Sequence, residues 1–423
     1  MKKEILMLSY MYPPTWSIAT QRSAKFAKYL KESWYIVHVI TVYNKCILQK
    51  KDKSLLKDIK WIKVYKLIDI EIVLRYINWF FLYFKLKKIS TLFSSLFVPD
   101  FSVLWWFLAF IKAKKIIKKH NIYTVFTTSS PYTSHIVWLK LKNHFWKKIQ
   151  WICDFRDEWT NNPFILDDVS NKKSKKFKKE FILESKVLEK SDKIIWITDI
   201  MNNNFINIHS EINLKKNKFF VISNWYDNKL NINWYNKKNE KLTFSHIWSF
   251  YWRQNPLLLL NAINNLVNKQ LIDENKISIK LYWNSNYSSE MKQLLNPNIY
   301  DLKWYIPNEE VIEIQKQSDI LILIIWIWKN SESIYTWKIF EYITMNRLIL
   351  WIIDPKWVAA QLIKETETWV IIDHNSLTDT EQTILRLYKK WNEDNININP
   401  NWEEVKKYSR KNLTQKLINI IEK

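Results

Sequence analysis

The segment SESIYTWKIFEYITMNRLIL, residues 331–350, joins two apolar runs through a charged helix. The run before it, residues 319–327, is typical of a buried strand, and residues 348–353 indicate the next one. Lys338 and Glu341 stand three positions apart, so both lie on one face of the predicted helix. An open α/β sheet binds its ligand at the C-terminal ends of its strands, where this pair is expected. A solvated helix with one ion pair is the other interpretation, and spacing alone does not choose between them.

The same alternation of strand and helix continues on both sides of this segment. Helical spacing fills most intervals between the apolar runs, which favours parallel sheets built from βαβ units. We therefore expect an α/β fold with two doubly wound, Rossmann-like domains facing each other across a cleft. The other predicted strands lie at residues 4–10, 35–42, 61–67, 123–129, 150–156, 193–198, 219–223, 242–247, 277–282, 302–306 and 369–372.

The domain boundary is expected in the Asn- and Lys-rich tract that begins at residue 224. This gives an N-terminal domain at residues 1–225 and a C-terminal domain at residues 226–395. Residues 396–423 contain a last helix, which is expected to pack back on the first domain.

The composition is that of a globular protein with an excess of positive charge. The 423 residues carry a formal net charge of +24, which suits an anionic partner such as nucleic acid, lipid head groups or nucleotide phosphates. The sequence has no signal-peptide pattern, and no clean apolar run reaches the ~18 residues of a spanning helix. Cys46 and Cys153 form neither a disulfide framework nor a metal-binding spacing, so a reduced, cytoplasmic location is expected.

The chain has no glycine but 25 tryptophans, although glycine averages about 7% of residues in proteins. An α/β protein of this size needs glycine in its left-handed turns. Trp34, Trp225 and Trp369 stand at turn positions that suit glycine. We therefore hypothesise that UGA codons, translated here as tryptophan under an alternative genetic code, encode glycine in the source organism.

Two stretches of the first half are candidate ligand sites. The loop at residues 11–17 leads into a helix, and its N–H groups suit an anion if position 16, here Trp16, is small. Arg22 in that helix either points toward the same opening or is solvated. The strand at residues 150–156 ends in a polar cluster that forms either part of the site or a structural ion-pair group: Asp154, Arg156 and Asp157.

Metal and nucleic-acid motifs are missing from the sequence. No cluster of His, Cys, Asp and Glu has zinc-site spacing, and no Walker loop or helix-turn-helix pattern can be assigned. His135 follows a predicted strand end, where it is either a catalytic or a structural histidine. Residues 72–88 and 101–119 are aromatic segments with lysine rims, which either lie in a membrane interface or pack in the core.

Taken together, the motifs resemble a bacterial glycosyltransferase of family 4, which has the GT-B architecture. The resemblance covers about residues 4–373, and reading several tryptophans as glycine improves it, whereas Trp159 matches an aromatic position of the family. The tryptophans that fit glycine are Trp16, Trp34, Trp225, Trp248, Trp252 and Trp369. The matching segments are YPPTWSIATQRSAKFAKYL (12–30), SSPYTSH (129–135), DFRDEWT (154–160), SNWYD (223–227), HIWSFYWRQNP (246–256), WYIPNEEV (304–311) and YTWKIFEYITMNRLIL (335–350).

The resemblance implies a role for each candidate residue. Glu341 would bind the donor ribose, and Arg253 and Lys338 would neutralise its diphosphate. Trp16 and its loop would lie near the donor phosphates, with His135 and Asp157 near the sugar and the acceptor. Family members carry a second glutamate eight positions before the one matched by Glu341; here that position is Ser333, with Glu332 one residue away.

The expected activity is that of a retaining, hexosyltransferase-type enzyme. It would move a sugar from a nucleotide-diphosphate-sugar, its substrate, to a glycan or lipid-linked acceptor in cell-surface polysaccharide or glycolipid synthesis. No metal or cofactor is expected, and no nucleic-acid partner, while basic segments would hold the enzyme at the anionic inner face of the cell membrane. The alternatives are a nucleotide-sugar epimerase of the same two-domain fold and a basic nucleic-acid-binding protein.

Overall fold

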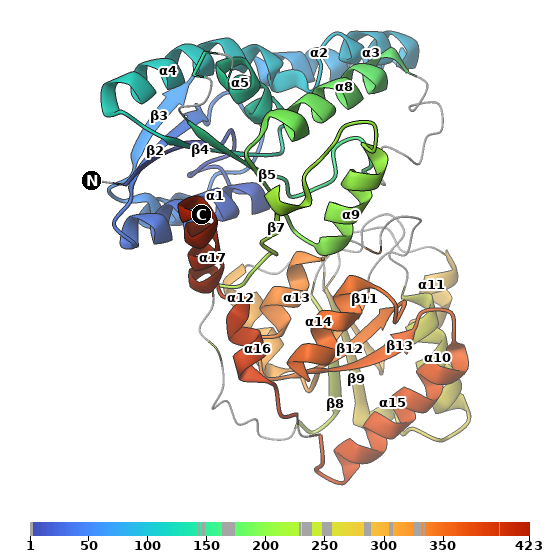
Figure 1. The fold of residues 1–423 in the computed structure, drawn as a ribbon. Helices are drawn as coiled ribbons and strands as arrows, with labels where there is room; N and C mark the ends of the chain where they lie inside the picture. The colour runs from blue at the N-terminus through green and yellow to red at the C-terminus, as the bar shows by residue number, and fades with distance from the viewer. Residues whose placement is uncertain are drawn as a thin grey trace. The chain divides into compact units, whose positions relative to one another are not determined.

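The computed structural model describes residues 3–142, 144–145, 149–162, 174–227, 230, 239–247, 256–282, 289–303, 308–324, 332, 335–396 and 398–423. These residues form two compact units (Figure 1). Unit 1 comprises Met1–Ser223 and Arg410–Lys423, and unit 2 comprises Asn224–Ser409. The chain thus leaves unit 1 at Ser223, two residues before the predicted boundary, and its last helix belongs to unit 1.

Unit 1 is built on a sheet of seven parallel strands in the order β3-β2-β1-β4-β5-β6-β7. The order reverses between β1 and β4, which is where doubly wound folds bind their ligands. All seven strands begin and end within two residues of their predicted bounds. They are β1 (Glu4–Leu8), β2 (Ile36–Val42), β3 (Lys63–Leu67), β4 (Thr124–Thr128), β5 (Gln150–Asp154), β6 (Lys193–Trp196) and β7 (Phe219–Val221).

Helices cover both faces of this sheet, with α1 and α17 on one face and α4, α5 and α8 on the other (Figure 1). The predicted segment 72–88 is not one helix, because the chain turns at Lys85 with a φ of 58°. The helices are α1 (Ile18–Glu32), η1 (Lys53–Ile59), α2 (Glu71–Tyr83), α3 (Lys87–Ser95), η2 (Phe101–Leu104), α4 (Trp105–His120), α5 (Thr133–Lys142), α8 (Lys175–Lys190), α9 (Asp199–Ile208), η3 (Lys216–Lys218) and α17 (Arg410–Glu422).

Unit 2 repeats the design with six parallel strands in the order β10-β9-β8-β11-β12-β13. Its central strands are continuous apolar runs such as LILWII, because a parallel sheet buries both of its faces. The strands are β8 (Leu242–His246), β9 (Ile277–Tyr282), β10 (Tyr300–Lys303), β11 (Ile320–Ile324), β12 (Leu348–Ile353) and β13 (Trp369–Asp373).

Two hydrophobic cores sandwich the sheet of unit 2. One lies under α10 and α15, and the other lies under α13, α14 and α16. The order of strands here reverses between β8 and β11. The helices are α10 (Leu257–Asn268), η4 (Glu274–Lys276), α11 (Ser289–Leu294), α12 (Asn308–Gln317), α13 (Trp337–Tyr342), α14 (Val358–Thr366), α15 (Leu377–Asn392) and α16 (Trp402–Lys407).

Two tryptophans of unit 1 occupy backbone positions that favour glycine. Trp34 follows the cap of α1 with a φ of 70°, and its N–H and that of Tyr35 bond to Lys31 and Leu30, as in a Schellman motif. Trp61 has a φ of 76° at the third position of a turn closed by Ile62 N–H and Ile59 C=O. The side chains of Trp34 and Trp61 are 90% and 77% exposed.

Among the described residues, no helix is both long and apolar enough to span a membrane. The prediction of two doubly wound α/β units is confirmed by the two parallel sheets.

Candidate functional site

The charged pair Lys338 and Glu341 lies on α13 of unit 2, the first described helix after β11. Strand β11 is one of the two strands at which the strand order reverses, so the pair lies at the expected place for a ligand. Lys338 is only 8% exposed, whereas Glu341 is half-buried. The predicted helix and its pair of charges are therefore present, with the lysine drawn into the interior.

Burial changes the acid–base behaviour of Lys338. Desolvation lowers the pKa of its ammonium group to about 7, and the nearby Glu341 carboxylate partly opposes that shift. Near neutral pH the side chain is thus poised between its charged and neutral forms. An anionic ligand would favour the charged form, so the lysine can respond to a phosphate group with a full positive charge.

Trp337 opens α13 and contacts Glu341 of this pair. Its indole Nε1 donates a hydrogen bond to Glu341 Oε1 at 3.2 Å. A glycine at this position would release that carboxylate oxygen for another donor. Of the other positions predicted for the donor site in unit 2, Arg253 and Ser333 lie outside the described residues. The backbone carbonyl of Glu332 accepts from Val358 N–H at 3.3 Å.

In unit 1, Trp16 lies in the loop between β1 and α1 and is half-exposed. Its N–H group donates to the carbonyl of Lys50 at 2.8 Å, so this N–H is already used within the unit. The Ser17 hydroxyl caps α1 by accepting from Thr20 N–H at 3.0 Å. The loop lies at the carboxyl edge of the sheet, as predicted. The Trp16 N–H group and the Ser17 hydroxyl both bond within the protein.

Arg22, one turn into α1, is not part of this opening. Its guanidinium is buried and donates to both carboxylate oxygens of Asp154, with distances of 2.6 to 3.1 Å. It also donates to the carbonyls of Ile222 and Ser223, both at 3.0 Å. The Thr128 hydroxyl completes the cluster with a 2.8 Å bond to Asp154. The structural ion-pair alternative is the right one for Asp154, whereas both alternatives for Arg22 were wrong, because its side chain is neither directed at the opening nor solvated.

The rest of the DFRDEW segment divides into structural and exposed residues. Arg156 donates to the backbone carbonyls of Ser129 and Ser130, the latter at 2.9 Å, and holds the turn after β4. Asp157 is exposed, so its carboxylate is accessible to a ligand. Trp159 is buried and stacks on Tyr132 with ring centroids 4.5 Å apart.

His135 lies on α5 and is fully buried. Its Nδ1 is 2.7 Å from the Thr127 hydroxyl, and its ring contacts Phe155 with centroids 4.4 Å apart. Burial lowers the pKa of the imidazole to about 3, so the ring is neutral at physiological pH. As placed here, it cannot meet a ligand directly and can act only through the residues it packs against.

A cavity of about 610 Å³ in unit 1 was not predicted from the sequence. It opens beside the turn after β4, and its lining includes hydroxyl groups of Thr91, Ser94, Ser95, Ser130 and Tyr132. Three carboxylates also line it: Glu71, Asp100 and Glu180. These acids come from separate parts of the chain, so no spacing in the sequence could reveal them.

Two acids of this cavity, Asp100 and Glu180, have perturbed pKa values. Burial raises the pKa of Glu180 to about 7 and also raises that of Asp100. Lys176 opposes the shift of Glu180, from which it is 3.8 Å away, and Thr133 donates to Asp100 at 2.7 Å. Cavities with several shifted carboxyl groups are candidate binding or catalytic sites. Arg75, Lys175 and Lys176 also line the cavity, so it offers a polar surface with charges of both signs for a ligand rich in hydroxyl groups.

Comparisons with known proteins identify the fold. No protein-family model and no curated protein sequence matches the chain. A glycosyltransferase structure from Rickettsia africae matches with a TM-score of 0.58 and 15% identity, covering 99% of this chain and 97% of its own. A variant of TarM from S. aureus, solved with fondaparinux, alpha-GlcNAc-glycerol and UDP, matches with a TM-score of 0.56 and 12% identity over 100% of both chains.

A third structure, HepE from Anabaena in complex with UDP-glucose, has a TM-score of 0.53 and 10% identity over 99% of both chains. At these identities the likeness concerns the fold. The chain therefore has the predicted GT-B fold, with a Rossmann-like α/β sheet in each unit.

The depressed pKa of Lys338 makes a prediction for stability. The unfolded lysine binds its proton up to a pKa of about 10.4, so between about pH 7 and pH 10 the unfolded state holds more protons. Stability should therefore rise with pH in that window, and the cost of the buried charge is fully present below it. Lys338→Met should raise the free energy of unfolding at pH 6 by on the order of a few kcal/mol and flatten the rise.

Urea unfolding between pH 6 and pH 9.5 measures this effect. Lys364→Met, which removes an exposed lysine from the same unit, is the matched control and should leave the pH profile unchanged. If the free energy of unfolding of Lys338→Met changes with pH in parallel with that of the wild type, the assignment of Lys338 as a buried ionisable group is wrong.

Proposed function

We propose that the protein transfers a sugar from a nucleotide-diphosphate-sugar to an acceptor, with retention of the anomeric configuration. The observation that carries the proposal is the buried Lys338 beside Glu341 at the ligand edge of the unit 2 sheet. The fold adds support, because structures of the same architecture have been solved with UDP and with UDP-glucose. Retention, and a hexose as the transferred sugar, rest on the family resemblance of the motifs.

In this proposal unit 2 binds the donor. Glu341 accepts hydrogen bonds from the ribose hydroxyls, and Lys338 contacts the diphosphate, with Arg253 as the second cation. Negative charge grows on the diphosphate as the bond to the sugar breaks, so a fixed cation stabilises the transition state more than the ground state. The ammonium of Lys338 suits this role because its charge is poorly solvated before the donor arrives. No metal is then needed for the transfer.

Unit 1 would bind the acceptor in its 610 Å³ cavity. Hydroxyl groups and carboxylates of the lining can exchange several hydrogen bonds with a sugar. The exposed Asp157, two residues before Trp159, is the proposed polar contact near the reacting sugar. His135 is proposed to position the strand end through Thr127 and Phe155. The acceptor would be a growing cell-surface glycan or glycolipid.

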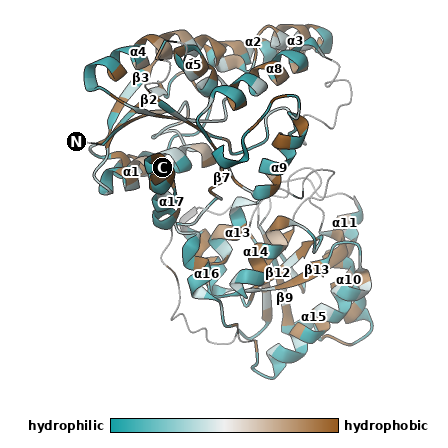
Figure 2. Cartoon of the chain, viewed as in Figure 1, coloured by the Kyte–Doolittle hydropathy of each residue, from teal (hydrophilic) through white to brown (hydrophobic). Residues whose placement is uncertain are grey.

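We further propose that unit 1 binds the anionic inner surface of the cell membrane through the α2–α3 surface. This surface consists of large apolar side chains that are at least 38% exposed, with Lys85, Lys87 and Lys88 exposed between them. Figure 2 shows the hydrophobic colouring along both helices. Its apolar residues are Val73, Tyr76, Ile77, Trp79, Phe80, Leu82, Tyr83, Phe84, Leu86, Ile89, Leu92 and Leu96.

The α2–α3 surface has the composition of an interfacial membrane anchor. Helix α2 buries only Glu71 and Leu74, so it is largely unpartnered within unit 1. Exposed Trp and Tyr beside Lys suit the boundary between acyl chains and anionic head groups. Arg75 and Glu71 lie on α2 and also line the cavity, so an acceptor with a lipid tail could enter beside the membrane.

We also propose that many tryptophans of this sequence are glycine in the native protein. Trp34 and Trp61 support this independently of composition, because a left-handed backbone costs about 1 kcal/mol or more for a residue with a Cβ atom. At position 337, glycine would free the Glu341 carboxylate from the indole that now bonds to it. Recoding therefore bears directly on the donor site.

The donor assignment predicts that Lys338→Ala lowers turnover at least ~10-fold, about 1.4 kcal/mol of lost transition-state stabilisation. Arg253→Ala is expected to act in the same direction, and Lys364→Ala is the control on an exposed face of unit 2. A panel of nucleotide-sugars with and without acceptor, followed by product analysis, provides the assay. Unchanged turnover in Lys338→Ala would refute the diphosphate contact, and conversion of donor alone to an isomer would indicate an epimerase.

The recoding proposal predicts that Trp34→Gly and Trp61→Gly each raise the free energy of unfolding by about 1 kcal/mol. Trp159→Gly should instead lower it by about 3 kcal/mol or more, because that ring is buried and stacked. Denaturant unfolding measures all three. Mass and tryptic sequencing of protein from its natural source should find glycine at positions 34, 61 and 225, and tryptophan there would overturn the proposal.

The membrane proposal predicts that the protein floats with vesicles rich in phosphatidylglycerol and much less with phosphatidylcholine vesicles. Replacing Lys85, Lys87 and Lys88 by Glu should weaken anionic-vesicle binding at least ~10-fold, because each basic residue contributes about 1 kcal/mol. The control makes the same charge change at exposed lysines of unit 2: Lys356, Lys389 and Lys390. Equal loss in both variants would show that net charge alone drives binding.

A further inference from the structure

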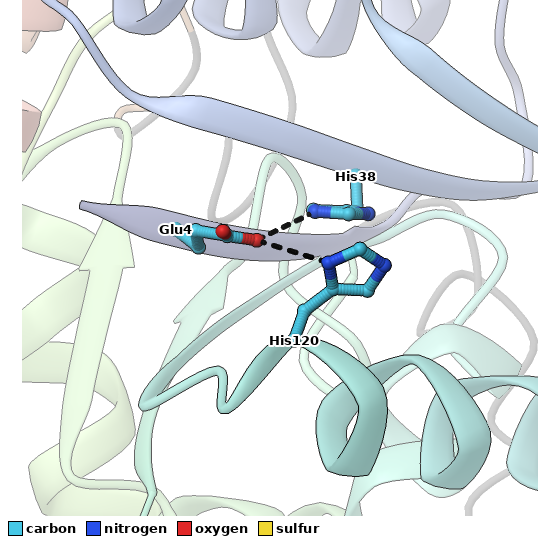
Figure 3. A group of neighbouring side chains, drawn as sticks. All are labelled: Glu4, His38 and His120. Carbon is cyan, nitrogen blue, oxygen red and sulfur yellow. Dashed lines mark hydrogen bonds and ion pairs between the residues drawn. The ribbon is translucent and has the colours of Figure 1, made fainter. Parts of the chain in front are cut away.

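Three side chains with metal-binding atoms meet at the amino end of the unit 1 sheet: Glu4, His38 and His120 (Figure 3). Glu4 begins β1, His38 lies on β2, and His120 is the last residue of α4. This is the opposite edge of the sheet from the loop of Trp16 and the turn after β4. The cluster is therefore separate from the candidate site described above.

The fold explains why these three residues converge. His38 pairs in register with Leu6, and alternate residues of a strand share a face, so Glu4 and His38 lie on the same face of the sheet. Helix α4 covers that face and ends at His120, after which Asn121 turns the chain with a φ of 49°. The carboxyl end of a helix carries a partial negative charge, which favours a cation beside His120.

The distances suit a single small ion. Glu4 Oε2 is 2.9 Å from His38 Nε2 and 3.5 Å from His120 Nδ1, and all three ligand atoms lie within 4.8 Å of one another. A tetrahedral zinc ion with bonds of about 2.0–2.1 Å separates its ligand atoms by about 3.3 Å. The two contacts of Glu4, at 2.9 and 3.5 Å, lie on either side of that value. Small side-chain rotations would bring the three atoms to a common centre.

The surroundings of His38 orient its ring toward the same point. Its Nδ1 is 3.3 Å from the Tyr65 hydroxyl, which leaves Nε2 to face Glu4. Ligating histidines commonly use their second nitrogen in this way.

We propose that Glu4, His38 and His120 bind one divalent transition-metal ion of the zinc class, with a fourth position open to water. Two imidazoles and a carboxylate are a donor set that zinc accepts. The ion would tie the first two strands to the end of α4. It takes no part in sugar transfer, so this inference stands or falls independently of the proposed function.

Titration of the untagged, chelator-treated full-length protein with zinc chloride tests the proposal. Calorimetry should give saturable binding of one ion per chain, and thermal unfolding should shift to higher temperature by mass action. Cobalt(II) in place of zinc should give the visible absorption of a tetrahedral site. Absence of saturable binding by the wild-type protein would overturn the proposal.

Variants assign the ligands. His120→Ala and the nearly isosteric Glu4→Gln should each weaken zinc binding at least ~10-fold and remove the thermal shift. His144→Ala, which removes an exposed histidine of the same unit, is the control and should bind like the wild type. Circular dichroism verifies that each variant is folded. Equal affinity in Glu4→Gln, His120→Ala and the wild type would place the ion elsewhere and refute the assignment.

Discussion

The buried ion pair between Arg22 and Asp154 is the interaction on which unit 1 depends. It joins α1 to the end of β5, and the same guanidinium holds the carbonyls of Ile222 and Ser223, where the chain leaves the unit. Loss of one partner from such a pair costs about 3–5 kcal/mol, a large part of the 5–15 kcal/mol that typically stabilises a protein. Arg22 belongs to the segment at residues 12–30 that resembles a donor loop, but its side chain has a structural role. Any ligand binding by this segment therefore depends on its other residues.

The proposed ligand sites of the two units differ in their chemistry. Unit 2 presents the buried ammonium of Lys338, whereas the cavity of unit 1 combines the carboxylates of Asp100 and Glu180 with basic side chains. In the proposed reaction this separates the tasks: a cation meets the leaving diphosphate, and acidic groups meet the acceptor hydroxyls. Burial shifts the pKa of Lys338 and that of Glu180 toward neutrality from opposite sides, so each group can change charge when its ligand binds.

Local patterns account for what the sequence could predict. Runs such as 348–353 identify buried parallel strands, and the spacing of Lys338 and Glu341 placed them on one helix at a strand end. What could not be predicted depends on contacts far apart in the chain. Arg22 is 132 residues from Asp154, and the acids of the unit 1 cavity and the proposed metal ligands converge only through the sheet. The position of His135 after a strand end did not reveal that its ring is fully buried.

The return of α17 to unit 1 has a consequence for biosynthesis. Leu413 and Leu417 of this helix are buried against unit 1, and Lys193 donates to the carbonyl of Ile420. A nascent chain that has passed residue 223 therefore lacks the helix that covers α1, and it acquires that helix only after all of unit 2 has been synthesised. Unit 1 is therefore completed only when residues 410–423, which follow unit 2 in the chain, become available. Unit 1 does not have all of its parts when unit 2 begins to be made, unlike a domain that folds as a unit from the N-terminus.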